Sequence, residues 1–312
     1  YGGACSSVSI APSQCTIPAS VGFTTLATPA QGAAAGGPPA PTTFSRADTG
    51  NTVTSDTVDQ GTFTGAGGTL QIVSGQTTVS NPIALDTGLT VDTNSQAGTL
   101  SGVISGTGGL TVSGTSGTLT LTAVNTYTGP TTINTGATLI NQGTINSASA
   151  ITNNGTFTNT GTAGNLTNNG TATNSGTLAN IINAITGLFT NNSGGTVASV
   201  NNAGTFTNNG TAGAVTNSGT VNNSRTTGAV TNNNHGTFNN NVGGTTGAVT
   251  NNAGGVFNNR GTTTTVNNLG TFTNFAGATT GAFTNGVTGV LTNNGTIASL
   301  SNYGTVTNNG PI

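Results

Sequence analysis

Few side chains in this sequence could transfer a proton, attack a substrate or hold a metal ion. His235, in the segment NNNHGTF, is the single histidine among 312 residues, and the two cysteines, Cys5 and Cys15, stand far from it in the sequence. A zinc site needs three or four nitrogen and sulfur ligands, and a serine triad needs a histidine beside an acid. Neither set can be assembled, so we expect no enzyme, no catalytic residue, no cofactor and no metal, and we place His235 at a solvated corner.

The acidic residues give no catalytic or metal-binding pattern either. Every acid precedes residue 93, and Asp56 and Asp59, although close, do not form the paired carboxylates of a glycosidase. A calcium site of the repeat-toxin kind needs an Asp in each glycine-rich nonapeptide, and no Asp follows residue 92. The charged side chains are Arg46, Asp48, Asp56, Asp59, Asp86, Asp92, Arg225 and Arg260.

Thr-x-Thr pairs are the remaining candidate for a binding function. In a strand the middle residue points inward and both threonines point outward, so stacked pairs would form a flat double row of hydroxyl and methyl groups. Such rows are similar to the faces of ice-binding solenoids, and a polysaccharide is the other ligand to consider. Strand propensity on a solvated face explains the same residues without a ligand, and Asn222, Asn239 and Val256 interrupt the rows. The candidate face comprises Thr156, Thr158, Thr171, Thr173, Thr205, Thr207, Thr271, Thr273, Thr305 and Thr307.

The composition excludes several classes of protein. Charged residues make up 3% of the chain, against about a quarter in typical soluble domains. Three arginines without lysine cannot form the positive surface of a nucleic-acid-binding protein, and no apolar run approaches the 18 or so residues of a membrane-spanning helix. Apolar residues still make up 32% of the chain and are regularly spaced, so we expect packing rather than disorder. The chain begins at Tyr1, from which we expect a processed protein.

An apolar residue recurs through the second half of the chain at intervals of 15 to 19 residues. Val200, Val215 and Val230 follow one another at steps of 15. This period is too short for helical repeats of more than about 30 residues, while Thr, Val and Phe favour strands and Asn-Gly favours turns. The pattern predicts an all-β fold, a β-solenoid or parallel β-helix of roughly triangular cross-section with 15–19 residues per coil. The predicted core ladder comprises Phe157, Phe206, Val215, Val221, Val230, Phe238, Val249, Phe257, Val266, Phe272 and Phe283.

Stacked coils place like residues above like at the inter-strand spacing of about 4.8 Å. Phe and Val ladders then fill the interior, and Asn ladders exchange side-chain amide hydrogen bonds along the axis. Like charges stacked in this way would repel each other, so the lack of charge follows from the architecture. Asn-Gly-Thr at Asn154, Asn169, Asn209 and Asn294 also matches the glycosylation acceptor pattern. We favour the simpler interpretation, that Asn-Gly is the turn that the repeat needs.

One phrase in the first half resembles a known bacterial repeat. The segment GTLTLTAVNTYTGPTTINTGATLI, residues 117–140, together with SGVISGTGGLTVSG, residues 101–114, is similar to the autotransporter-associated strand repeat of secreted passenger domains. Pro130 stands where that family usually has Gly, and Ala137 is inserted before Thr138. The resemblance implies a right-handed β-helical passenger secreted across a Gram-negative outer membrane, and it carries no catalytic residue. The usual C-terminal translocator barrel is not found in this sequence, so we expect either that it was cut away or that the protein leaves the cell by another route.

The sequence divides into three regions. Residues 1–50 hold both cysteines and a Pro/Gly/Ala linker, TPAQGAAAGGPPAPTTF. The secreted context implied by the resemblance favours a Cys5–Cys15 disulfide over two free thiols. Residues 51–150 are interpreted as irregular solenoid coils, and residues 151–312 as the regular Asn/Thr/Gly-rich array.

These features together predict a non-enzymatic structural protein on the cell surface, such as a fibre, sheath or adhesin stalk. The C-terminal coil, residues 300–312, keeps the repeat without a polar cap, and we expect residues 1–50 of the next subunit to meet it in a head-to-tail homopolymer. A binding module that uses the threonine face for ice or a surface polysaccharide is the alternative.

Overall fold

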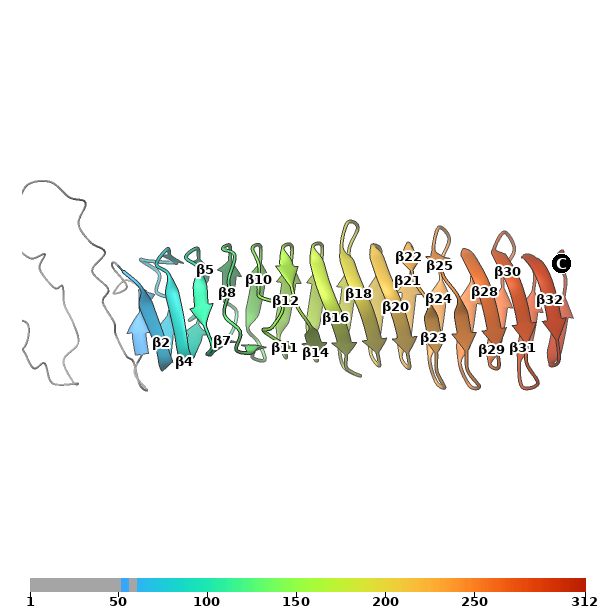
Figure 1. Ribbon diagram of the computed structural model, residues 1–312, viewed down its shortest axis with the longest axis horizontal. Helices are drawn as coiled ribbons and strands as arrows, with labels where there is room; N and C mark the ends of the chain where they lie inside the picture. The colour runs from blue at the N-terminus through green and yellow to red at the C-terminus, as the bar shows by residue number, and fades with distance from the viewer. Residues whose placement is uncertain (1–51, 56–60) are drawn as a thin grey trace, which may run out of the picture. The chain divides into compact units, whose positions relative to one another are not determined.

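The structure confirms an all-β solenoid with parallel strands. The computed structural model describes residues 52–55 and 61–312, which form about 15 turns of strand and corner without an α-helix among them (Figure 1). All strand pairings between successive coils are parallel. The predictions for residues 1–50, including the Cys5–Cys15 disulfide, lie outside the described residues.

The strands form two long sheets along the solenoid axis. The fourteen-strand sheet contains β3 (Thr78–Val79), β5 (Ala97–Leu100), β8 (Thr118–Leu121), β10 (Thr138–Asn141), β12 (Thr156–Asn159), β15 (Thr171–Asn174), β17 (Leu188–Asn191), β19 (Thr205–Asn208), β21 (Thr220–Asn223), β24 (Thr237–Asn240), β27 (Val256–Asn259), β29 (Thr271–Asn274), β31 (Val290–Asn293) and β33 (Thr305–Asn308).

The nineteen-strand sheet contains β1 (Thr52–Thr54), β2 (Phe63–Gln71), β4 (Ile83–Asp92), β6 (Ile104–Gly106), β7 (Gly109–Ser113), β9 (Thr131–Ile133), β11 (Ile151–Asn153), β13 (Thr162–Ala163), β14 (Leu166–Asn168), β16 (Thr177–Asn183), β18 (Thr196–Asn202), β20 (Thr211–Asn217), β22 (Thr226–Thr227), β23 (Val230–Asn232), β25 (Thr245–Thr246), β26 (Val249–Asn251), β28 (Thr262–Asn268), β30 (Thr279–Asn285) and β32 (Thr296–Asn302).

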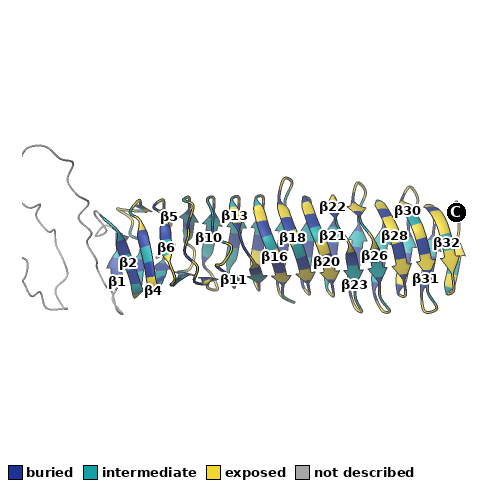
Figure 2. Ribbon diagram, in the orientation of Figure 1, coloured by how far each residue is buried: buried dark blue, intermediate teal, exposed yellow. Residues whose placement is uncertain are grey.

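Each coil has three arms, and two of them belong to the same sheet. In one 15-residue coil, residues 205–208 form the arm in the fourteen-strand sheet, and β20 supplies the other two. Inside and outside alternate along β20 except at Gly213 and Ala214, which both face outward. The strand therefore bends there into a first arm, residues 211–213, and a second arm, residues 214–217. Figure 2 shows the resulting alternation of buried and exposed positions along the strands.

The strand register reproduces the repeat read from the sequence. Val200 pairs with Val215 and Val215 with Val230, one coil apart in each case. The coils are longer in the first part of the solenoid, where Leu70 pairs with Val91 and Val91 with Val112, at steps of 21 residues. The extra residues of the longer coils lie in corners and in the bend of the nineteen-strand sheet.

The apolar core runs the length of the described coils. All eleven residues of the predicted core ladder are buried, each with no more than 3% of its surface exposed. The rings of Phe238 and Phe257 stack with centroids 4.8 Å apart, and those of Phe257 and Phe272 stack at 5.0 Å. Offset aromatic stacking at this separation matches the rise between coils, so one residue type can repeat at the same place.

Two ladders of asparagine also lie inside the solenoid, which confirms the predicted asparagine ladders. In the fourteen-strand sheet each Nδ2 donates to the Oδ1 one coil further on, as from Asn208 to Asn223 at 2.9 Å. The second arm carries the other ladder, as from Asn202 to Asn217 at 2.8 Å. The first ladder comprises Asn141, Asn159, Asn174, Asn191, Asn208, Asn223, Asn240, Asn259, Asn274, Asn293 and Asn308. The second comprises Asn153, Asn168, Asn183, Asn202, Asn217, Asn232, Asn251, Asn268, Asn285 and Asn302.

The ladder amides also donate hydrogen bonds to backbone carbonyl groups, in addition to the asparagine of the next coil. Asn217 Nδ2 also donates to the carbonyl oxygen of Gly219 in its own corner at 3.0 Å and to that of Thr237 at 3.1 Å. The amides thereby give the corner carbonyl groups a second donor, since Gly219 O also accepts a hydrogen bond of 2.8 Å from the backbone N–H of Thr237. Within these two inner ladders every amide link runs in one direction, with the donor in the earlier coil, because each side chain repeats the conformation of the one below.

The first ladder begins with an unpaired atom. Asn141 pairs in the sheet with Leu121, which offers no donor, and Asn141 Oδ1 is buried without a hydrogen-bond partner. The second ladder begins above Ile133, but Asn153 Oδ1 accepts a hydrogen bond of 3.2 Å from the backbone N–H of Gly155. A buried unpaired amide oxygen is destabilising, so the change from an apolar core to a mixed core carries a local free-energy cost.

Candidate functional site

The ten threonines of the predicted face lie in two rows on the outer surface of the fourteen-strand sheet. Thr156 pairs with Thr171 and Thr158 with Thr173, and the Oγ1 atoms of the latter two are 3.2 Å apart in a hydrogen bond. The same two rows continue through β19, β29 and β33. The structure therefore brings these side chains onto one face, half-buried or exposed between their neighbours.

Other side chains interrupt both rows. Leu188, Val256 and Val290 take positions in the first row. In the second row Asn222, Asn239 and Asn258 replace threonine and form an outer amide ladder with links of 2.9 Å. A ligand that needs an unbroken lattice of threonines would find runs of no more than a few coils on this sheet.

A longer threonine row lies on the first arm of the nineteen-strand sheet, where the sequence reasoning did not place one. Nine exposed threonines pair in successive coils without interruption, and some of their hydroxyl groups are hydrogen-bonded to each other, as from Thr279 to Thr262 at 3.1 Å. The signal in the sequence is the Gly-Thr step that opens most first arms. The row comprises Thr162, Thr177, Thr196, Thr211, Thr226, Thr245, Thr262, Thr279 and Thr296.

Small residues border this row and keep the first arm flat. Gly213, Gly228 and Gly247 follow the inward-facing residue in three coils, and a Cβ atom at Gly213 would collide with the carbonyl oxygen of Ala198 in the preceding coil. The backbone of adjacent coils approaches too closely there for a side chain. The outer surface of the first arm is therefore a row of threonines beside nearly bare backbone.

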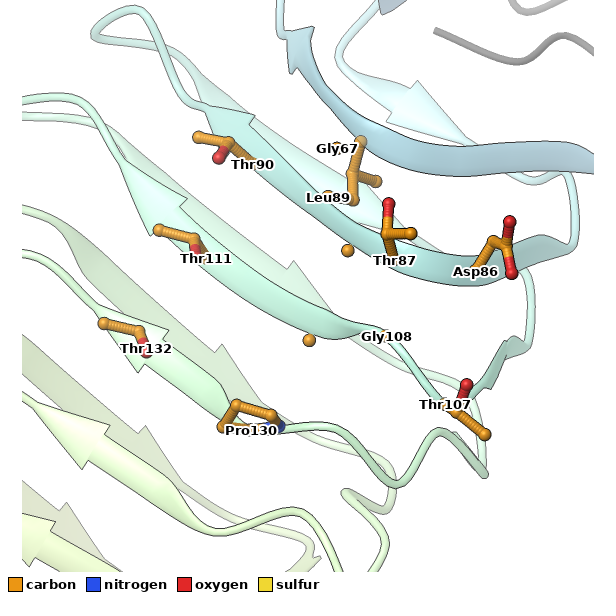
Figure 3. Close-up of a pocket in the computed structure, with 12 residues that line it drawn as sticks. Gly67, Asp86, Thr87, Leu89, Thr90, Thr107, Gly108, Thr111, Pro130 and Thr132 are labelled. Carbon is orange, nitrogen blue, oxygen red and sulfur yellow. The ribbon is translucent and has the colours of Figure 1, made fainter. Parts of the chain in front are cut away.

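A depression of about 370 Å³ lies at the bend of the nineteen-strand sheet in the early coils (Figure 3). Its lining combines threonine hydroxyl groups with glycines, and Asp86 stands at its edge. Gly88 adopts a φ of 148°, and a Cβ atom at Gly108 would meet the backbone of Gly88 at 2.5 Å. The hollow thus results from glycines that the bend requires. Its one charged group, the Asp86 carboxylate, is exposed.

The two arginines of the regular array lie at one corner of the solenoid, between the fourteen-strand sheet and the first arm. Arg225 directly precedes the first-arm residue Thr226, and Arg260 follows the ladder residue Asn259. The guanidinium of Arg260 stacks on the Phe275 ring at 3.8 Å from its centroid. A cation–π contact of this kind holds one arginine against the corner, while the side chain of Arg225 is exposed.

Two residues of the motif that resembles the autotransporter repeat, Asn125 and Tyr127, hold neighbouring coils together inside the solenoid. Asn125 Oδ1 accepts a hydrogen bond of 2.9 Å from the backbone N–H of Ile104, where a strand carbonyl would otherwise stand. Tyr127 is fully buried, and its hydroxyl shares a hydrogen bond of 2.6 Å with Thr131 Oγ1, which contacts Ser149 Oγ at 2.9 Å. Burial raises the pKa of the Tyr127 phenol to about 12, and its hydroxyl neighbours lower it by less.

Within the described residues, no group of three or more His, Cys, Asp or Glu side chains could hold a metal ion. His235 lies exposed in a corner between the second arm and the fourteen-strand sheet, with a φ of 65°. No helix in the part of the chain that the structure describes is long and apolar enough to cross a membrane.

Comparison with known proteins does not place the chain in a family. No family model matches the sequence, and no curated protein matches it.

Proposed function

We propose that this protein is a non-enzymatic structural component of a bacterial cell surface, a rigid rod within a fibre, sheath or adhesin stalk. The observation that carries the proposal is the pair of asparagine ladders, which run unbroken through the regular array beside the apolar core. Each coil is hydrogen-bonded to the next through backbone and side chain alike. Such a repetitive interior resists bending and needs no ligand.

Secretion as a Gram-negative passenger is part of this proposal. It is supported by the resemblance of residues 101–140 to the autotransporter repeat and by the structural use of Asn125 and Tyr127 from that motif. The near absence of charge suits a protein that associates on a surface.

Head-to-tail assembly is the mode that we propose for the rod. On the outward edge of β32 and β33, Leu300 and Val306 are only partly buried, and Asn302 and Asn308 are exposed. Such an edge is covered by whatever coil follows on the axis, from the same chain or from a second copy. A covering strand would extend the backbone hydrogen bonds and accept from the ladder amides. We propose that residues 1–50 of a second copy supply this cover.

Electron microscopy of the full chain tests the proposal. Rods that join end to end are expected, and deletion of residues 1–45 should leave single rods at the same concentration. Fibres unchanged by the deletion would exclude the N-terminal role. A full-length chain that stays monomeric would exclude the homopolymer.

A binding module is the second candidate, favoured by the aligned Thr-x-Thr pairs of the fourteen-strand sheet. Thermal hysteresis, or retention on a polysaccharide column, by the monomeric chain would support it. The variants Thr158→Val and Thr173→Val should then lower either activity, because the hydroxyl groups are removed with little change of shape.

A further inference from the structure

The few charges of this chain are separated along the sequence. Residues 1–92 carry Arg46 and all five aspartates, a formal charge of −4, whereas residues 93–312 carry Arg225 and Arg260, a formal charge of +2. In the described coils the acids are Asp86 and Asp92, both on β4. The arginines of the regular array therefore have no acid within their own half of the solenoid.

Two of the charges in the described coils have no partner among the described residues. Asp92 accepts hydrogen bonds of 3.0 Å from Gln71 Nε2 and from the backbone N–H of Asn94, and Arg260 stacks on Phe275. The Asp86 carboxylate and the Arg225 guanidinium, by contrast, make no hydrogen bond or ion pair with any described residue. Both residues are exposed.

Asp86 and Arg225 stand on opposite edges of the same flat surface, the outer face of the first arm. Arg225 lies where the chain enters the first arm, and Asp86 lies at the bend where the chain leaves it. The coil of Asp86 and the coil after Arg225 are eight steps apart, from Ile83 through Ile104 and on to Thr227. At about 4.8 Å per step this is about 38 Å along the axis.

We propose that a second copy of this chain packs against the first-arm face, parallel to the first and displaced by eight coils, with Arg225 of one copy paired to Asp86 of the other. Two parallel rods packed face to face bring the arginine edge of one against the aspartate edge of its neighbour. An antiparallel pair would instead set arginine edge against arginine edge. Charge complementarity therefore selects the parallel arrangement and its offset.

The surface between the two charges suits close packing of sheets. With the eight-coil offset the threonine row of one copy, from Thr196 to Thr296, faces the early coils of the other copy, up to the coil of Thr162. The small threonine and glycine residues of that row let the two first arms approach closely, as in stacked β-sheets. Val103 and Val124, which are 44% and 64% exposed, extend the row into the early coils. With this offset they would lie against the coils of Thr245 and Thr262 in the second copy.

The predicted contact is weak for a single pair and repeats along a fibre. Two successive displacements amount to sixteen coils. The first and third copies lie on the same side of the second, and because each has fifteen described coils they do not overlap along the axis. Overlap of about seven coils across one narrow arm covers less than the roughly 800 Å² per partner of stable interfaces. Association therefore relies on many such contacts in series.

This inference rests on the proposed structural function, and a charge exchange tests it separately. The full chain is compared by sedimentation velocity at low ionic strength with Asp86→Arg, Arg225→Asp and the double variant. Each single change sets like charges together and should weaken side-by-side association about tenfold. The double variant should recover the original association to within about twofold. Arg260→Asp is the matched control, since it reverses the same charge at the same corner and should have little effect.

Electron microscopy supplies the second readout, since paired rods should be displaced by about 38 Å, eight coils. A double variant as weak as the single variants would overturn the proposal, as would a control as damaging as Arg225→Asp, which would point to general binding of anions at that corner. Wild-type rods that never pair would also overturn it. Rods that form but pair without charge rescue would leave the structural function standing, whereas a chain that forms no rods would contradict that function itself.

Discussion

Replacement of one buried ladder asparagine measures how much the ladder hydrogen bonds add to the stability that strand packing alone provides. Asn201 and Asn202 are neighbours on β18, so they share backbone geometry and differ in the side of the sheet that they occupy. Asn202 is fully buried in the ladder of the second arm, whereas Asn201 is exposed and its side chain forms no hydrogen bond with a described residue. We expect Asn202→Ala to be strongly destabilising and Asn201→Ala to be nearly neutral.

The magnitude follows from the hydrogen bonds that are lost. Asn202 accepts one from Asn183 Nδ2 at 2.7 Å and donates to Asn217 Oδ1 at 2.8 Å, and it also donates to two carbonyl oxygens at 3.0 Å. A net contribution of about 1 kcal/mol each would suggest about 4 kcal/mol. Asn183 keeps two carbonyl acceptors and Asn217 keeps a backbone donor, so neither neighbour is stranded. We therefore expect a loss of about 2–3 kcal/mol for Asn202→Ala, and less than about 0.5 kcal/mol for Asn201→Ala.

Urea unfolding followed by circular dichroism measures the difference. A solenoid can unfold in sections. Hydrogen exchange of the backbone amides in β18 and β20 (Thr211–Asn217) should therefore be measured beside the urea unfolding. Protection should fall in these coils for Asn202→Ala and remain unchanged for Asn201→Ala. Equal unfolding midpoints for the two variants would refute the reasoning, since the buried amide chain would then contribute no more than a solvated side chain.

Three further changes test other parts of the fold. Tyr127→Phe should make the stability of the protein less sensitive to alkaline pH. In the folded protein the pKa of Tyr127 is raised to about 12, above its usual value of 10.0, so the stability that the neutral phenol contributes below pH 10 is lost as the pH rises towards 12. A series of urea midpoints against pH measures this loss. Phe257→Ala removes a fully buried ring stacked on both sides and should cost about 3–5 kcal/mol in urea unfolding. Gly213→Ala should lower the thermal midpoint by forcing coils apart, whereas Gly75→Ala, where a Cβ atom meets nothing within 4 Å, should leave it unchanged.

The fold could be predicted because each coil repeats the same chemistry. The spacing of Val200, Val215 and Val230 gave the register directly, since in-register parallel stacking requires like residues at equal steps. The coils of 21 residues in the first part were not counted from the sequence, because Leu70, Val91 and Val112 recur without a shared phrase around them. Leucine and valine alternating with threonine fit many strand registers equally well.

Burial of the asparagines follows from the two-residue period of a strand, but it was not among the predictions. Phe206 and Asn208 are two residues apart in one strand, so both must face the same side. The polarity of the amide predicts the opposite, namely that asparagine should face solvent. The structure resolves the conflict by pairing every amide with the next, so that the desolvated groups are satisfied. The uninterrupted threonine row was not predicted, because most first arms carry a single outward threonine and so contain no Thr-x-Thr pair.

The candidate sites depended on information that one coil does not contain. The position of Arg225 relative to Asp86 requires the number of coils between them and the arm that each borders, and both come from the three-dimensional stacking. Turn residues such as those around Arg225 vary in number between coils, from two to four. Periodicity therefore predicts which residues lie inside, but a corner residue is placed only when the whole stack is known.

The rarity of charge and the stability of the rod have one physical origin. A ladder position must accept from the coil below and donate to the coil above, and a carboxamide does both with one side chain. A carboxylate at the same place could accept but not donate, and an ammonium or guanidinium could donate but not accept. Either would also be a buried charge stacked near others like it. Serine or threonine has one hydroxyl hydrogen, which cannot serve both the next coil and a corner carbonyl. Asparagine is thus the short side chain that closes this network. Among the described residues the charged side chains lie outside the ladders, and Asp86, Arg225 and Arg260 stand at a bend or a corner, where a contact between rods can use them.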